Sequence, residues 1–144
     1  MPNPNYNRTI TLYNCLKAVD NPDSNKDIWY KHIIEHCFYK SFTGIEGFQT
    51  SIRSTNGYTV RIPKSVKYKP YKEWIQLSEE ERKEFFTGRI DDLVILGVSE
   101  EEVTGERPNT SAQVLNRNKP EAFMVSAFSD NTNSLYGKHY RLGG

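Results

Sequence analysis

Three histidines, His32, His36 and His139, are the side chains of this sequence best suited to bind a metal or to transfer a proton. His32 and His36 are spaced i, i+4, which would place both on one face of a helix, with Glu35 between them. The pattern is not HExxH, because Ile33 stands where that motif needs its glutamate. On a strand the two rings would share a face about 13 Å apart, too far for one metal ion. We therefore expect polar surface histidines and no metal site.

A thiol nucleophile is a second possibility, because His36 directly precedes Cys37. Neighbouring residues of a strand point to opposite faces, which works against a catalytic pair. Cys15 and Cys37 lie 22 residues apart without CxxC spacing, so we expect two buried free thiols. Asp91 and Asp92 are expected to end a loop before a buried strand rather than to act as an acid/base pair.

Nucleotide-binding and hydrolase motifs are missing from the sequence, which has no GxGxxG, no P-loop and no GxSxG. We expect no catalytic residue, no cofactor and no metal, so the chain is predicted not to be an enzyme. Residues 64–72 interleave four lysines with Tyr68 and Tyr71. Such a stretch could meet phosphates or stack bases, but lysine stems more often cover apolar surface in a solvated connector. We expect the connector.

The overall charge narrows the class of protein further. The chain has 144 residues with 19 Lys and Arg against 18 Asp and Glu, a formal charge of +1. This balance argues against a dedicated nucleic-acid binder and against a polybasic membrane-surface protein. No apolar run is long enough for a transmembrane helix, and the first residues lack the pattern of a signal peptide. We expect a protein made in the cytoplasm.

The elements that must position these residues are mostly strands. Alternating apolar residues predict strands over residues 8–13 and, with more ambiguity toward a helix, over 27–42. Asn56-Gly57 predicts a two-residue turn in a hairpin over residues 49–62. A continuous apolar run predicts a buried central strand over 93–96, and further strands are expected over 121–129 and 136–142.

One helix is expected, over about residues 79–86. Ser78 and Glu81 have the spacing of a capping box, and acidic residues fill the first turn. The expected fold is mainly β, a small β-barrel or sandwich of six to seven strands with this helix and long polar loops. The expected organisation is a polar N-terminal arm over residues 1–7 and a single β-barrel-like domain over residues 8–144.

The order of several short motifs resembles a family of small virion proteins of tailed bacteriophages and prophages of Gram-positive bacteria. The motifs are Ile10-Thr11-Leu12-Tyr13-Asn14, Trp29-Tyr30, Val60-Arg61-Ile62-Pro63, Trp74, Asp92-Leu93-Val94-Ile95-Leu96-Gly97, Val125-Ser126-Ala127-Phe128-Ser129-Asp130-Asn131 and Gly137-Lys138-His139-Tyr140-Arg141-Leu142-Gly143-Gly144. They span nearly the whole chain. The capped helix at 79–86, the longer N-terminal segment and Ser134-Leu135-Tyr136 depart from the family pattern.

This resemblance implies a structural role in joining the phage head to the tail. The implied protein is a subunit of the head–tail connector, or neck: a stopper or head-completion ring around the DNA channel. A tail-terminator or other tail-side ring is the alternative. The implied partners are other copies of the chain, a portal or adaptor protein on the head side, a tail-terminator or tail tube on the tail side, and double-stranded DNA in transient, non-specific passage, with no membrane. The implied location is the neck of the virion.

Near-neutral charge suits a channel wall along which DNA must slide, because many phosphate contacts would hold the DNA tightly. Polar loops and termini are the expected contacts between subunits: Asn3, Asn5, Tyr6, Asn56, Gly57, Asp130, Asn131, Lys138, His139 and Tyr140. The hairpin tip at Asn56-Gly57 is a candidate plug or docking element. A hypothesis of a different class is also retained, a small β-barrel enzyme or ligand-binding protein that uses His32, Glu35 and His36.

Overall fold

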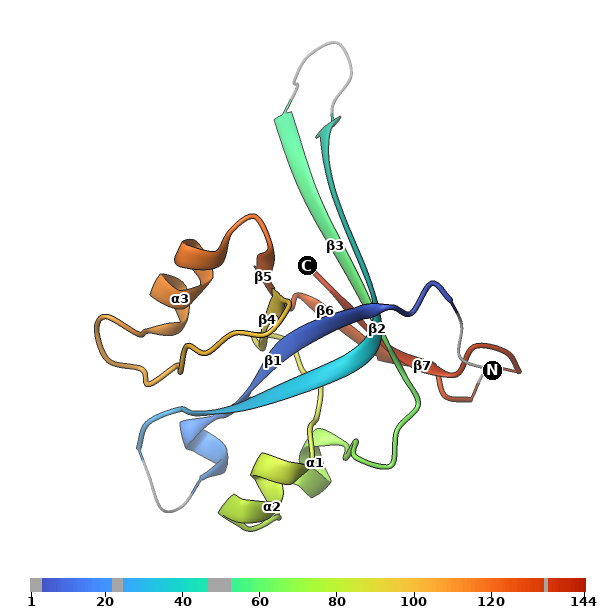
Figure 1. Cartoon of the computed structure of the whole chain (residues 1–144). Helices are drawn as coiled ribbons and strands as arrows, with labels where there is room; N and C mark the ends of the chain where they lie inside the picture. Colours follow the sequence, from blue (N-terminus) through green and yellow to red (C-terminus); the bar gives the residue numbers. More distant parts are fainter. Residues whose placement is uncertain (1–3, 22–24, 47–52, 134) are drawn as a thin grey trace.

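The computed structural model describes residues 4–21, 25–46, 53–133 and 135–144 (Figure 1). Its elements are β1 (Arg8–Leu16), the 3-10 turn η1 (Ala18–Asp20), β2 (Ile28–Glu46), β3 (Arg53–Pro63), α1 (Tyr71–Trp74), α2 (Glu79–Glu84), β4 (Leu93–Leu96), α3 (Ser111–Asn118), β5 (Ala122–Met124), β6 (Ala127–Asp130) and β7 (His139–Gly143). The protein is mainly β, as the sequence predicts. Seven antiparallel strands form one sheet that curls into a half-barrel, with three short α-helices outside it.

The two edge strands of this sheet follow each other in the chain. The strand order is β5-β4-β1-β2-β3-β7-β6, and Val125 and Ser126 alone separate the edge strands β5 and β6 in the sequence. The Val125 N–H donates to the Asp92 carbonyl at 2.7 Å, and the Ser126 N–H donates to the Gly143 carbonyl at 2.8 Å. The prediction of one strand over 121–129 is therefore wrong, because the chain crosses from one edge of the sheet to the other in the middle of that run.

A bulge in β2 changes which of its residues face inward. Ile10 pairs with Ile34 and Arg8 pairs with Cys37, so two residues of β2 lie opposite the single residue Thr9. His36 takes the left-handed conformation, with φ 60°, that such an extra residue often needs. Before the bulge His32 is buried, and after it Cys37 is buried. Side chains alternate along a strand, so one extra residue shifts by one position which residues after the bulge point into the core.

The hairpin of β2 and β3 has a different turn from the predicted one. Asn56 and Gly57 pair with Thr43 and Phe42 inside β3, so they do not form its turn. The pairing continues to Glu46 and Arg53, and the connection falls at residues 47–52, outside the described residues. Local turn preference is outweighed here by a register that extends an eleven-residue strand through the Asn-Gly pair.

Hydrophobic side chains pack in three places. The interior of the half-barrel is filled from most strands, with Leu12, Val60 and Leu142 among its fully buried residues. A second cluster lies outside β1 and β4, where Tyr13 and Leu93 are covered by Val114 of α3. In the third, Trp74 packs with Leu16 and Tyr30 beneath α1 and α2. The sheet is therefore buried on both faces along β1 and β4.

The helices confirm one prediction and correct another. α2 has the predicted capping box of Ser78 and Glu81, although it ends at Glu84 rather than at residue 86. α3 was missed, because the one helix expected from the sequence is that over residues 79–86. Its own capping box, Thr110 with Gln113, was the available signal.

Candidate functional site

The most prominent external feature is a two-stranded hairpin that projects from the barrel, at the top of Figure 1. We call residues 40–46 of β2 and 53–58 of β3 the projecting hairpin. β7 accompanies β3 only from Thr59 to Pro63, and β1 accompanies β2 no further than Cys37. From Phe42↔Gly57 to Glu46↔Arg53 the two strands therefore pair with each other and with no other described strand. Asn56 and Gly57, both predicted contact residues, lie on this hairpin.

The outer side of β3 and β7 and of the adjoining part of β2 forms a basic face. Val60, Ile62 and Leu142 point into the core, so the residues between them point outward. Across the sheet, Phe38 pairs with Arg61, and Arg61 pairs with Arg141. The outward residues are Phe38, Lys40, Thr59, Arg61, Pro63, His139 and Arg141, and this set contains no carboxylate.

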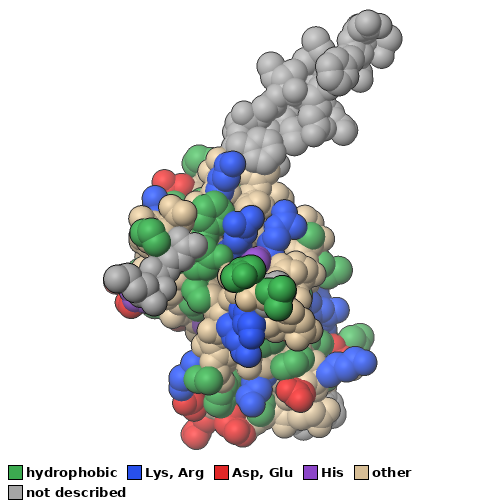
Figure 2. All heavy atoms as spheres, turned by 90° about the vertical axis from the view of Figure 1, so that its right-hand side faces the viewer, with side chains coloured by type: hydrophobic (Ala, Val, Ile, Leu, Met, Phe, Trp, Pro, Cys, Tyr) green, Lys and Arg blue, Asp and Glu red, His purple; other side chains and the backbone are tan. Residues whose placement is uncertain are grey.

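The cations of the basic face have no acidic partner among the described residues. Lys40 and Arg141 form no ion pair there, and the Arg61 guanidinium lies 5.2 Å from the centre of the Phe38 ring instead. Figure 2 looks at the molecule from the side of the N-terminal segment and shows Lys and Arg side chains interleaved with hydrophobic ones over its middle. Most Asp and Glu side chains in that view lie toward the lower end.

A hollow of about 350 Å³ marks the margin of the basic face. It is lined by Asn5, Tyr6, Phe38, Arg61, Tyr136, Gly137 and His139. The Tyr6 and Phe38 ring centres lie 6.2 Å apart, so the N-terminal segment meets the barrel here. The hollow thus brings together three of the predicted contact residues, Asn5, Tyr6 and His139, from distant parts of the sequence.

The other predicted contact residues lie in different environments. The Asn131 side chain lies 3.3 Å from the His139 ring nitrogen, and Asp130 accepts hydrogen bonds from the backbone and hydroxyl of Thr132. Lys138 is exposed. Tyr140 instead points inward, where its ring stacks on Tyr68 with centres 4.0 Å apart, so it belongs to the core rather than to the surface. Asn3 lies outside the described residues.

The residues of the histidine hypothesis, His32, Glu35 and His36, do not share one side of β2. His32 is 7% exposed, and its ring faces Phe86 in the interior, whereas Glu35 and His36 are exposed. Burial lowers the pKa of His32 to about 4, so its ring is neutral at physiological pH. His32 and Glu35 both border an open depression of about 480 Å³, but His36 does not. The expectation of two surface histidines is correct for His36 and wrong for His32.

The described residues show neither a cluster of metal ligands nor a reactive thiol. They contain no group of three His, Cys, Asp or Glu side chains that could hold a metal ion. Cys15 and Cys37 are both free and buried, as predicted. Burial raises the pKa of each thiol to about 12, which suppresses the reactive thiolate.

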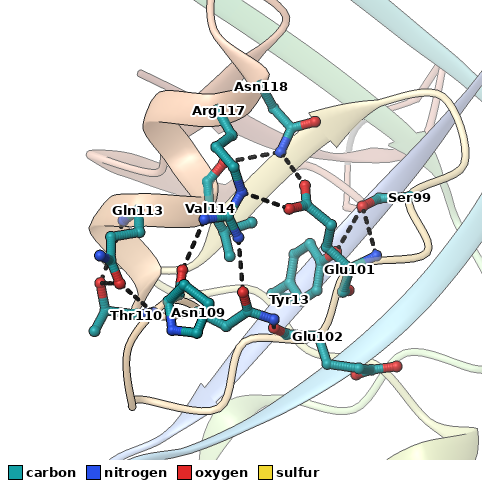
Figure 3. A network of polar contacts seen from close by, with 11 residues as sticks. Tyr13, Ser99, Glu101, Glu102, Asn109, Thr110, Gln113, Val114, Arg117 and Asn118 are labelled. Atoms are coloured by element: carbon teal, nitrogen blue, oxygen red, sulfur yellow. Dashed lines mark hydrogen bonds and ion pairs between the residues drawn. The ribbon is translucent and has the colours of Figure 1, made fainter.

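The opposite side of the barrel is covered by a layer made of residues 98–118, which includes α3. Figure 3 shows the polar contacts that hold this layer together. The Glu101 carboxylate accepts hydrogen bonds from Asn118 at 2.6 Å and from Arg117 at 2.7 Å, and these bonds lower its pKa. The Tyr13 hydroxyl of β1 donates to the Glu101 carbonyl at 2.7 Å. These contacts attach the layer to the sheet beneath it.

Comparison with known proteins places the chain in a family. The model of a family of unknown function, DUF6751, matches residues 5–144. The chain belongs to this family. None of the curated proteins matches the chain, and none of the solved structures does. Among the described residues of this DUF6751 member, no helix is long and apolar enough to cross a membrane.

Proposed function

We propose that this DUF6751 protein is a structural subunit of the head–tail connector of a tailed bacteriophage, a stopper or head-completion ring around the DNA channel. The projecting hairpin is the observation that carries the proposal. A two-stranded hairpin without further sheet neighbours is at best marginally stable in water. A partner that packs against it would offset the cost of ordering it, and neighbouring subunits of a ring supply such a partner in every copy.

The barrel suits the proposed role in two further ways. Its edge strands β5 and β6 have only three and four residues, so the sheet offers little free edge for unspecific strand addition. The basic face is half-buried at Phe38, Arg61 and His139, where the N-terminal segment meets it, and exposed at Lys40 and Arg141. On the other side, β1 and β4 are covered by residues 98–118. A sheet face with exposed Lys40 and Arg141 next to a projecting hairpin is a surface suited to contact with other proteins rather than to an enclosed substrate.

Purified particles test the role. In the phage or prophage that encodes this chain, we expect the protein in intact virions, at the junction of head and tail in a reconstruction of the particle. Virions assembled without it should release their DNA if it is a stopper. Heads that retain their DNA but carry tails of irregular length would favour the tail-terminator alternative. Absence of the protein from purified virions would overturn both forms of the proposal.

A variant with a shortened hairpin tests whether the projecting hairpin is needed for assembly. Joining Ser41 to Tyr58 through Asn-Gly removes the projecting part and keeps the pairing of β3 with β7. We expect the variant to fold, as measured by circular dichroism and thermal melting, and to be missing from virions. The matched control is Glu80→Gln on α2, an exposed residue without an ion pair in the described chain, which should be incorporated normally. Normal incorporation of the shortened variant would show that the projecting hairpin is not needed for assembly.

A further inference from the structure

The near-zero net charge of this chain conceals two oppositely charged blocks. Residues 53–72 contain six Lys and Arg and no Asp or Glu. Residues 73–106 contain eleven Asp and Glu and three Lys and Arg. Blocks of this kind give a molecule different faces of opposite sign, and such faces determine which surfaces meet when proteins associate.

The first block contributes to the basic face. Arg61 lies on its central strand, and Lys64, just beyond β3, donates its backbone N–H to the Lys138 carbonyl at 3.1 Å. Lys64 and Lys138 are both exposed and lie just beyond the ends of β3 and β7, close to the face that carries Lys40, Arg61 and Arg141. None of these five cations forms an ion pair with a described carboxylate. The face is thus free to take negative charge from outside the subunit.

The second block supplies an acidic edge on the covering layer. We call the segment from Glu100 to Glu106 the acidic edge. Glu100, Glu102 and Glu106 are exposed on it, while Glu101 holds α3 in place. Glu102 and Glu106 contact Lys31 and Lys26 at 3.0 and 3.3 Å, and Glu100 has no ion pair among the described residues. Four carboxylates face three cations, Lys26, Lys31 and Arg117, so the edge keeps a surplus of negative charge at Glu100.

The two surfaces lie on opposite sides of the barrel. In the order β5-β4-β1-β2-β3-β7-β6, the pair β4 and β1 is separated from the pair β3 and β7 by β2 on one side and by the edge strands β5 and β6 on the other. The acidic edge belongs to the layer outside β1 and β4, and the basic face is the outer side of β3 and β7. Figure 1 shows α3 and the preceding segment on the side of the barrel away from β7.

We propose that the basic face of one copy docks on the acidic edge of a second copy, so that subunits associate head to tail. Two different surfaces on opposite sides of a subunit generate a heterologous contact, and repeated contacts of this kind close into a ring when the rotation fits. The partner is a second copy because the chain itself supplies the complementary surface. The inference rests on the proposed ring and specifies which surfaces form it.

Charge reversal on each surface separately gives the test. K40E/R141E makes the basic face acidic, and E100K/E106K makes the acidic edge basic; all four residues are exposed. In either variant alone, like charges meet at every contact, so the apparent dissociation constant at low salt should rise at least tenfold. In an equal mixture each reversed surface meets the reversed surface of the other variant, and each native surface meets a native one. Assembly should return in the mixture.

Sedimentation velocity at low and high salt measures these outcomes, with the wild-type chain and K40R/R141K as controls that keep the charge. Thermal melting confirms that each variant is folded. A wild-type chain that stays monomeric, unchanged assembly in the single variants, or a mixture that does not assemble would each overturn the proposal. So would K40E/R141E losing affinity for duplex DNA while assembling normally, because the basic face would then serve a polyanion. None of these measurements depends on virions. A failure of the proposed contact can therefore be distinguished from a failure of the proposed connector role.

Discussion

The Asn14 side chain donates a 2.9 Å hydrogen bond to the carboxylate of Asp92, in a place where both residues are almost completely buried. The other carboxylate oxygen accepts from the Cys15 backbone N–H at 3.0 Å. Asn14 also donates to the Thr87 carbonyl at 2.7 Å and accepts from its N–H at 3.1 Å. This network ties β1 to the segment that leads into β4. Despite these bonds, burial raises the pKa of Asp92 to about 7.

Two buried groups give folding stability opposite dependences on pH. The folded chain keeps the Asp92 proton up to about pH 7, whereas the unfolded chain loses it near 3.8, so this group lowers stability as the pH rises between those values. His32 has a pKa of about 4 when folded and 6.5 when unfolded, so it raises stability as the pH rises from 4 to 6.5. The two contributions oppose each other across most of this range.

We therefore expect Asp92→Asn and His32→Phe to change the pH dependence in opposite directions. From pH 4 to 7, the unfolding free energy of Asp92→Asn should rise relative to the wild type by on the order of 2 kcal/mol. That of His32→Phe should fall relative to the wild type by a similar amount from pH 4 to 6.5. Urea unfolding followed at several pH values measures both. Parallel curves for all three proteins would contradict the assignment.

The bulge in β2 depends on the left-handed conformation of His36, with φ 60°. A β-branched residue is strained there, so His36→Val should lower the unfolding free energy by about 1–2 kcal/mol. His36→Gly should leave stability unchanged or raise it by up to about 1 kcal/mol, because glycine adopts positive φ without a steric cost. Glu35→Gly, the neighbour without positive φ, is the control and should destabilise by about 1 kcal/mol. Equal losses for both glycine variants would argue against the bulge.

Arg117 connects α3 to the rest of the covering layer. Besides Glu101, it donates to the Pro108 carbonyl at 2.7 Å and to the Asn109 side chain at 2.8 Å. Arg117→Ala should cost about 1–2 kcal/mol and speed hydrogen exchange over residues 98–118 more than in the barrel. Arg107→Ala removes an exposed arginine of the same layer that forms no ion pair in the described chain, and it should change neither measurement. Uniformly faster exchange would show that the layer does not open separately.

Gly88 packs directly against a ring of β6. A Cβ at this position would lie 2.2 Å from the nearest atom of the Phe128 side chain, so one of the two must move. Gly88→Ala should lower the unfolding free energy by on the order of 2 kcal/mol. Combining it with Phe128→Ala should cost less than the sum of the single changes, since the clash disappears. Gly143→Ala controls for the backbone effect of alanine alone, because Gly143 has no positive φ and a Cβ there would lie 3.6 Å from its nearest neighbour, an ordinary contact.

Local pattern in the sequence determined much of the secondary structure. The alternation of Ile10 and Leu12 with Thr11 and Tyr13 predicts β1, the apolar run Leu93–Leu96 predicts β4, and Ser78 with Glu81 predicts the start of α2. Each of these signals involves residues within a few positions of one another. Free, buried cysteines were also predictable, because their spacing matches no disulfide or metal pattern.

Tertiary structure alone decided which surfaces are free. The bulge in β2 leaves His36 exposed although His32, four residues earlier, is buried. The register of β2 and β3 places Asn56-Gly57 within a strand. The crossing at Val125 and Ser126 divides one apolar run between two sheet edges. These outcomes depend on pairing between segments far apart in the chain, which no local pattern specifies. The same pairing gathers the cations of residues 40, 61 and 141 on one face, so a charge of +1 in the sequence becomes a polarised surface in the fold.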